Sequence, residues 1–400
     1  MNRPPDPDTA RRLRLIASRM SRRGFLRAVG VGGAAVAGGG LLGACGIGGA
    51  QSDGEQGSTS VAGEEVGGVL NFSNWPLYVD PGRNGTLNDF EQKTGVKVNY
   101  FEDINSNEEY FAKIQGELSQ GEDIGRDLMV LTDWMVDRLI NFGWLTPLDH
   151  EAIPNMDNVV DNLRSPSFDP DREFSLPWQS GITGIGYNPQ LTGREIFAIE
   201  DLFAPELAGQ VTFLTEMRDT MSLVMASMGV DPANYEFSDY EAAIDKLQKA
   251  VDSGQARAFT GNDYAADLAA GNIGAAIAWS GDVIQSQFDN PDIKWVLPAE
   301  GGLLWSDNMC IPANAAHVAN AHALMNFVYD PEIAAQVAAW VNYITPVEGA
   351  KEAMGELDPS LVDNELIFPS QETLAQTYEF NVPPDEEQQY QEMFQAVIGA

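Results

Sequence analysis

Cysteine, histidine and basic residues are scarce in this chain of 400 residues. It has 2 cysteines and 3 histidines, and its 23 lysines and arginines face 59 aspartates and glutamates. The sequence therefore offers no CxxC pair and no histidine spacing typical of a metal site. The net charge of −36 argues against a nucleic-acid partner, because binding to a phosphate backbone needs basic contacts.

Signatures of catalysis are missing as well. The sequence contains no GxSxG motif and no phosphate-binding loop. Asp169 and Asp171 form a short acidic stretch, but the glycine and the distal glutamate of a calcium loop do not follow them. We therefore predict a protein that is not an enzyme and that needs no cofactor and no metal.

The first 45 residues differ from the rest of the chain. Two adjacent arginines in "SRRGFLR" (21–27) precede a Gly/Ala-rich stretch, a pattern typical of a twin-arginine export signal. Seven of the 17 residues in 28–44 are glycine, so this stretch is a poor membrane span. The run "LGAC" (42–45) resembles the lipobox of bacterial lipoproteins, which implies cleavage before Cys45 and attachment of lipid to its sulfur. We expect residues 1–45 to be a twin-arginine signal with a lipobox.

This leader holds eight arginines and two aspartates, so the rest of the chain carries 15 basic and 57 acidic residues. Most of these carboxylates must be solvated surface, and charge alone identifies no ligand. Residues 46–68 are rich in Gly, Ser and Glu and predict a flexible tether. Cys310 lies in an apolar run and is expected to be a packed core thiol. The expected location is the outer face of the cell membrane, or the periplasm if the chain is cleaved without lipid.

After the tether, apolar stretches with the period of strands alternate with stretches that have the period of helices. This alternation predicts an α/β fold with mainly parallel sheets. The Gly-rich stretch 176–188 is expected to cross from one domain to the next, and the chain is too long for one core. The predicted strands are 69–75, 96–102, 127–133, 176–188, 209–216, 273–279 and 303–312. The predicted helices are 86–94, 107–120, 218–229, 239–253, 263–270, 318–328, 331–341 and 385–397, with a further helix after 127–133. Gly95 and Gly143 are expected to end the helix 86–94 and the helix after 127–133.

Aromatic residues lie close to carboxylates at or just after several predicted strands. Examples are "NWPLY" (74–78), "TDW" (132–134), "TEMRD" (215–219) and "WSD" (305–307). Ligands of open α/β sheets bind beyond the carboxyl ends of strands. A cleft of aromatic faces and carboxylates suits an organic ammonium ion, through cation–π contacts and charge-assisted hydrogen bonds.

Asp307 is the clearest of these acids. It lies in the apolar run "LLWSDNMCIP" (303–312), and no lysine or arginine occurs between Gly301 and Leu324. A buried carboxylate without a cation costs several kcal/mol. We predict that the ligand supplies the cation, with Trp305 providing a face for its carbon chain.

These motifs, in this order, resemble the spermidine/putrescine-binding proteins of bacterial ABC importers. The similarity runs from about Val69 to Phe394 and rests on "NWPLYVDP", "SLPWQSGITGIGYN", "AWSGD", "GGLLWSDNMCIPANA" and "PEIAAQVAAWVNYITP". It implies a type II periplasmic-binding-protein fold, in which two α/β lobes joined by a hinge close on a ligand in the cleft between them. The implied lobes are 69–181 with 307–350 (lobe 1) and 182–306 with 351–400 (lobe 2).

The resemblance also implies which residues bind the polyamine. Thr132 and Trp134 stand where the family has Ser and Tyr, Glu216 and Asp219 match an acidic pair, and Glu379 is the candidate for a late family glutamine. The complete implied set is Trp75, Tyr78, Thr132, Trp134, Glu216, Asp219, Trp279, Trp305, Asp307, Tyr343 and Glu379.

The role implied by the resemblance is that of a monomeric lipoprotein that delivers a polyamine to an ABC permease and its ATPase, and that meets the membrane only through its lipid. Two alternatives remain open. The same carrier fold could take another cationic cargo, such as a quaternary amine, a cationic amino acid or iron. The protein could instead be a surface lipoprotein that senses polyamines without a transporter.

Overall fold

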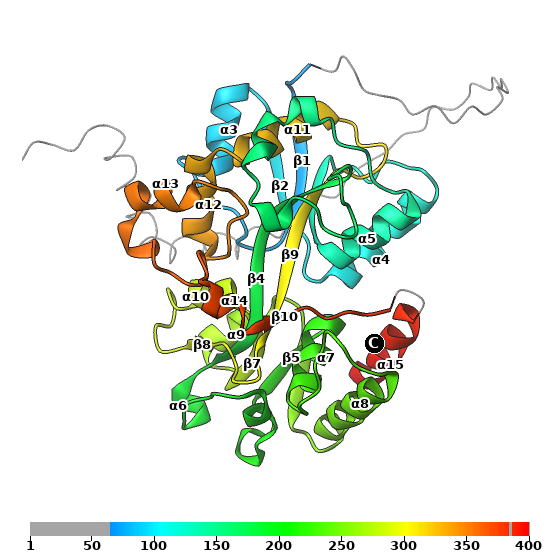
Figure 1. Ribbon diagram of the computed structural model, residues 1–400, viewed down its shortest axis with the longest axis vertical. Coiled ribbons are helices and arrows are strands. Elements are labelled where there is room, and N and C mark those ends of the chain that lie inside the picture. Colours follow the sequence, from blue (N-terminus) through cyan, green and yellow to red (C-terminus); the bar gives the residue numbers. More distant parts are fainter. Residues whose placement is uncertain (1–64, 384–385, 400) are drawn as a thin grey trace, which may run out of the picture. The chain divides into compact units, whose positions relative to one another are not determined.

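The computed structural model describes residues 65–383 and 386–399. The leader and Cys45 lie outside the described residues, as does most of the tether. Residues 65–400 form a compact unit of their own, and the described part of this unit is shown as a ribbon in Figure 1. No helix among the described residues is both long enough and apolar enough to cross a membrane.

The first part of this unit repeats a strand–helix pattern. The hydrogen-bonded order of its strands is β2-β1-β3, and β1 is parallel to both neighbours. Helices α3 and α5 end at Gly95 (φ 76°) and Gly143 (φ 70°), where the left-handed backbone favours glycine. The elements are β1 (Val69–Asn74), α3 (Thr86–Thr94), β2 (Lys97–Glu102), α4 (Asn107–Ser119), β3 (Leu128–Thr132) and α5 (Asp133–Phe142).

A second group of strands is built in the same way. Strand β5 is parallel to β6 and to β7. Helix α8 presents one apolar face and packs beside α7 and α15. The elements of this group are α6 (Pro189–Thr192), β5 (Val211–Leu214), α7 (Met217–Ala226), α8 (Phe237–Asp252), β6 (Ala256–Thr260), α9 (Tyr264–Ala270), β7 (Ala275–Trp279), α10 (Ser280–Ser286) and β8 (Lys294–Val296).

Two long strands, β4 (Ser175–Tyr187) and β9 (Gly302–Cys310), join the two groups. They are antiparallel to each other; β9 pairs with β3 and β4 pairs with β7, which makes one continuous sheet. Every residue of β4 is buried. Figure 1 shows β4 and β9 running between the upper and lower groups of elements. The predicted α/β class is therefore confirmed, and the long crossing strands add antiparallel pairs to it.

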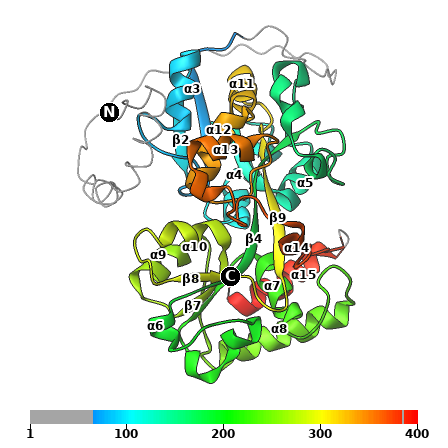
Figure 2. The ribbon, with the colours of Figure 1, turned by 60° about the vertical axis from the view of Figure 1, so that its left-hand side comes forward.

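The rest of the chain returns to both groups. Helices α11 and α12 lie with the first group in Figure 2, and α13 packs on α12 through Ala335, Ala338 and Met354. The bounds are α11 (Val318–Val328), α12 (Pro331–Val341), α13 (Ala350–Leu357), α14 (Gln371–Leu374), β10 (Thr377–Tyr378) and α15 (Glu387–Ile398). We use lobe 1 for the group with β1–β3 and α11–α13, and lobe 2 for the group with β5–β8 and α15. The residue boundaries predicted for the lobes remain a proposal.

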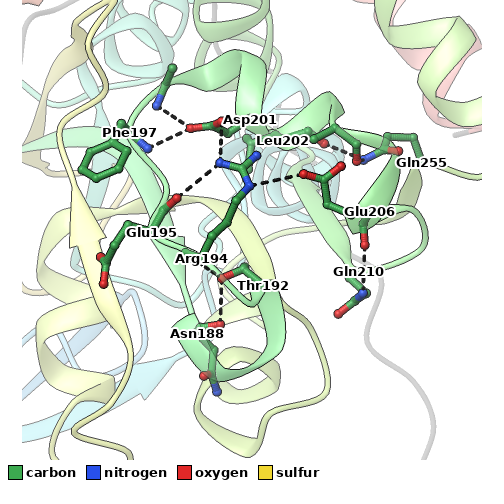
Figure 3. A network of polar contacts seen from close by, with 12 residues as sticks. Asn188, Thr192, Arg194, Glu195, Phe197, Asp201, Leu202, Glu206, Gln210 and Gln255 are labelled. Atoms are coloured by element: carbon green, nitrogen blue, oxygen red, sulfur yellow. Dashed lines mark hydrogen bonds and ion pairs between the residues drawn. The ribbon is translucent and has the colours of Figure 1, made fainter.

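In lobe 2, the segment between β4 and β5 is fixed by a polar network centred on Arg194 (Figure 3). Arg194 Nη1 lies 2.7 Å from Asp201 Oδ1, and Arg194 Nε lies 3.3 Å from Glu206 Oε1. Asp201 Oδ2 accepts hydrogen bonds from the backbone N–H groups of Phe197 and Ala198. Charges of both signs thus meet within one short segment of the chain.

Candidate functional site

A cavity lies beyond the carboxyl ends of β1, β3, β5 and β7, the position expected for a ligand site in such a sheet. The empty space within it and at its mouth amounts to about 410 Å³, a volume that includes open solvent. Residues of both lobes line it: Trp75, Pro76, Tyr78, Asn107, Thr132, Glu216, Asp219, Asn262, Trp279, Asp282, Trp305, Asp307 and Tyr343.

The structure brings together nine of the eleven residues predicted to bind ligand. The other two, Trp134 and Glu379, are not part of the lining. Trp134 is half-buried, and its ring faces the guanidinium groups of Arg218 at 4.2 Å and of Arg138 at 5.0 Å. Glu379 is exposed just after β10. For these two residues, contact with a ligand stays a prediction.

Aromatic rings form the walls of the cavity. The ring centroids of Trp75 and Trp279 are 5.7 Å apart, those of Trp279 and Trp305 are 6.4 Å apart, and each pair meets edge to face. Trp305 also lies 5.4 Å from Tyr343. Gly181 on β4 makes room for Trp305, because a Cβ there would lie 2.3 Å from the indole. The glycine-rich crossing strand thus has a steric role in shaping the wall.

Four carboxylates reach the cavity, and all are nearly buried. Glu216 is 2 % exposed and Asp307 is 4 % exposed. Burial raises the pKa of Glu216 to about 8, that of Asp307 to about 7 and that of Asp282 to about 6. Burial also raises the pKa of Asp219. Among the residues that the structure describes, no lysine or arginine lines this cavity, so the charged forms have no fixed cationic partner there.

The groups that hold these carboxylates are neutral. Thr132 Oγ1 donates to Asp307 Oδ1 at 2.8 Å. Trp279 Nε1 donates to Asp219 Oδ1 at 2.9 Å, and Thr183 Oγ1 donates to the same oxygen. Hydroxyl and indole donors orient a carboxylate, but they do not cancel its charge. The arrangement is therefore suited to a ligand that brings positive charge and apolar surface together.

Four lining residues were missed by the sequence analysis: Pro76, Asn107, Asn262 and Asp282. Asp282 accepts hydrogen bonds from the hydroxyl groups of Tyr343 and Tyr264 and from Asn262 Nδ2. Its signal was present in "AWSGD", where an acid closely follows a tryptophan, as in "WSD". Asn107 gives no such signal, because its partners are far away in the sequence.

Comparison with known proteins places these features in a family. The bacterial extracellular solute-binding protein family matches residues 86–368 of the chain. The spermidine/putrescine-binding periplasmic protein of Escherichia coli (strain K12) is 29% identical over 316 residues, which cover 79% of this chain and 87% of that protein. The putrescine-binding periplasmic protein PotF of the same strain is 28% identical over 335 residues, with 78% and 86% covered.

A solved structure leads to the same family. A putative spermidine/putrescine ABC transporter protein from Listeria monocytogenes has 31% sequence identity and a TM-score of 0.72, and the match covers 82% of this chain and 98% of that chain. The family match spans more than half of the 400 residues, and the relatives are binding proteins of transport systems, not enzymes. The chain belongs to the family of bacterial extracellular solute-binding proteins.

Proposed function

We propose that this chain is the substrate-binding lipoprotein of a polyamine ABC importer. It captures a polyamine of the putrescine or spermidine type in the cleft, closes around it and delivers it to the permease. Support comes from the names of the relatives, which include spermidine/putrescine-binding and putrescine-binding periplasmic proteins. Further support comes from the chemistry of the cavity.

The observation that carries the proposal is a set of buried carboxylates between aromatic walls, with no lysine or arginine among the described residues that line the cavity. A polyamine matches this set because it carries separate ammonium groups joined by methylenes. Asp307 and the pair Glu216/Asp219 are the proposed anchors for different amines. Trp279 and Trp305 are the proposed faces for the methylenes between them.

The relevant magnitudes favour such a cargo. A charge-assisted hydrogen bond contributes about 1.5–3 kcal/mol, and a cation–π contact contributes about 0.5–2 kcal/mol. Burial of four methylenes adds on the order of 3 kcal/mol. A betaine would leave its own carboxylate beside four acids, whereas an iron ion would use none of the aromatic surface. These considerations favour a polyamine over betaine and over iron.

A titration followed by tryptophan fluorescence tests the cargo. Trp75, Trp279 and Trp305 line the cavity, so a ligand there should change the emission. We expect saturable responses to putrescine or spermidine at moderate salt and no response to betaine. A response to betaine alone, or to none of putrescine, spermidine and spermine, contradicts the proposed cargo. Genes for a permease and an ATPase next to this one would argue against a sensor that lacks a transporter.

Export by the twin-arginine route and lipidation of Cys45 are also part of the proposal, and they rest on the sequence alone. We expect the full chain to sediment with membranes when it is expressed in a bacterium that processes lipoproteins. Cys45→Ser should move it to the soluble exported fraction, because the thioether anchor is lost. A Cys45→Ser chain that remains in the membrane fraction contradicts this anchor.

A further inference from the structure

The loop before α4 carries residues of lobe 1 into contact with lobe 2. The backbone N–H of Asn107 donates to Glu216 Oε1 at 2.6 Å, and Asn107 Nδ2 donates to the same oxygen at 3.2 Å. Two residues earlier, the backbone oxygen of Asn105 accepts from the N–H of Asn262 at 3.2 Å, and Asn105 Nδ2 donates to Asp263 at 3.2 Å. We call residues 105–107 the docking loop and residues 261–263 its acceptor.

The contact with Glu216 completes a helix terminus. Asn107 is the first residue of α4, and N–H groups in the first turn of a helix have no partner within the helix. A carboxylate is the preferred acceptor there, because the helix dipole is positive at this end. Glu216 therefore stabilises a helix of lobe 1 from its own position in lobe 2, immediately before α7.

The same asparagine organises the carboxylates of the cavity. Asn107 Nδ2 donates to Thr132 Oγ1 at 2.9 Å, and Thr132 Oγ1 donates to Asp307. Hydrogen bonds from the described residues reach Glu216 only at Oε1. The other oxygen, Oε2, thus remains for a ligand while Oε1 holds the docking loop. Asn107 thus contacts the Glu216 carboxylate directly and the Asp307 carboxylate through Thr132.

Gly261 is the residue that allows this close approach. A Cβ at this position would lie 2.3 Å from the backbone oxygen of Asn105 and 2.7 Å from Asn105 Nδ2. Its φ is outside the left-handed region, so the backbone itself would accept alanine. The absence of a side chain matters only because the docking loop lies against it. Gly261 is also outside the lining of the cavity.

On the basis of these contacts, we infer that Asn107 and Gly261 are positioning residues: docking of residues 105–107 onto residues 261–263 closes the cleft and sets the Glu216 and Asp307 carboxylates for the cargo. This inference rests on the proposed function. If a cargo binds only when residues 105–107 are docked, its apparent association constant is proportional to the fraction of molecules in which they are docked. A change at Gly261 should therefore weaken all cargoes by the same factor, whereas a change in a cargo-contacting residue alters their ranking.

The test compares Gly261→Ala with Gly116→Ala in the otherwise complete chain. Gly116 lies on α4, and a Cβ there would meet nothing within 4 Å. We expect Gly261→Ala to raise the Kd of putrescine and that of spermidine by the same factor, on the order of tenfold. Small-angle X-ray scattering should show that the compaction on ligand addition is reduced. Gly116→Ala should match the wild type in both measurements.

Amide hydrogen exchange at Asn107 and Asn262 gives a readout that does not depend on cargo identity, because both N–H groups donate across the docking contact. We expect faster exchange at both amides in Gly261→Ala. Unchanged exchange together with wild-type Kd values overturns the inference, and so does a changed ratio of the two Kd values. If the wild type binds no polyamine, the proposed function fails, and the exchange rates still decide whether the loop docks.

Discussion

Carboxylates cluster both in the cavity and in the Arg194 network, but their negative charge is compensated in different ways. In the network, Asp201 meets Arg194 at 2.7 Å and accepts two backbone N–H groups. Partial burial raises the pKa of Asp201, but these hydrogen bonds outweigh it, and the net pKa is below its usual value. In the cavity, burial dominates, and the pKa of Asp307 rises to about 7.

The difference between the two regions concerns where the compensating charge comes from. The network is complete within the protein, so its carboxylates contribute to stability. The carboxylates of the cavity are oriented by neutral donors, and their charged forms are compensated only when a cation enters. Residues of the first kind should affect folding, and residues of the second kind should affect binding.

The largest expected effect comes from a comparison in which the same Asp→Asn change is made in each region. Only the change in the cavity should weaken binding. Asp307→Asn removes a charge-assisted hydrogen bond worth about 1.5–3 kcal/mol, which corresponds to a tenfold to hundredfold loss of polyamine affinity. Asp201→Asn is the matched control and should leave the affinity unchanged. Isothermal titration calorimetry with putrescine and spermidine measures both. Wild-type affinity in Asp307→Asn would exclude a role for this carboxylate in binding.

The second prediction uses pH. A carboxyl group whose folded-state pKa is raised contributes stability that is fully present below its unfolded pKa of about 4 and is lost as the pH rises through the folded pKa. For Asp307 and Glu216 this loss falls between about pH 4 and pH 8. Without ligand, the stability of Asp307→Asn relative to the wild type should therefore increase between pH 5 and pH 8, by on the order of 2 kcal/mol.

Urea unfolding at the two pH values measures this difference. Polyamine affinity should move the other way, because amines stay protonated over this range while the carboxylates lose their protons as the pH rises. We expect tighter binding of putrescine to the wild type at pH 8 than at pH 5. A wild type that gains stability over Asp307→Asn between pH 5 and pH 8 would contradict the assignment of Asp307 as a buried acid without a cation.

Much of the fold could be predicted from local sequence patterns. The helices at 318–328 and 331–341 have the predicted bounds, and Gly95 and Gly143 end helices as expected. These features depend on periodicity and on backbone preferences of single residues. Nine of the eleven predicted site residues line one cavity because ends of parallel strands meet at one edge of a sheet.

The remainder depends on contacts between distant residues, which no local pattern reports. Trp134 was predicted to bind the ligand; its ring faces Arg218 of lobe 2 at 4.2 Å, and Trp134 is not part of the cavity lining. Asn107 lines the cavity and donates a hydrogen bond to Glu216, which is 109 positions away in the sequence. The steric need for glycine at position 261 appears only when the docking loop lies against it. Local chemistry thus identified the ends of the strands, and tertiary packing decided which side chains share a cavity.

The smallest expected effect lies in the network. Asp201→Ala removes the acceptor of two N–H groups at the start of a short 3₁₀ segment (Ile199–Phe203) and the ion pair with Arg194. Loss of such a cap costs about 1 kcal/mol, and a partly exposed ion pair adds at most about 1 kcal/mol. The urea midpoint should fall without a change in slope, because the same surface unfolds. Putrescine affinity should stay at the wild-type value, since Asp201 does not line the cavity. If affinity fell several-fold instead, the network would have to be coupled to the cleft, and the separation between carboxylates for folding and carboxylates for binding would not hold.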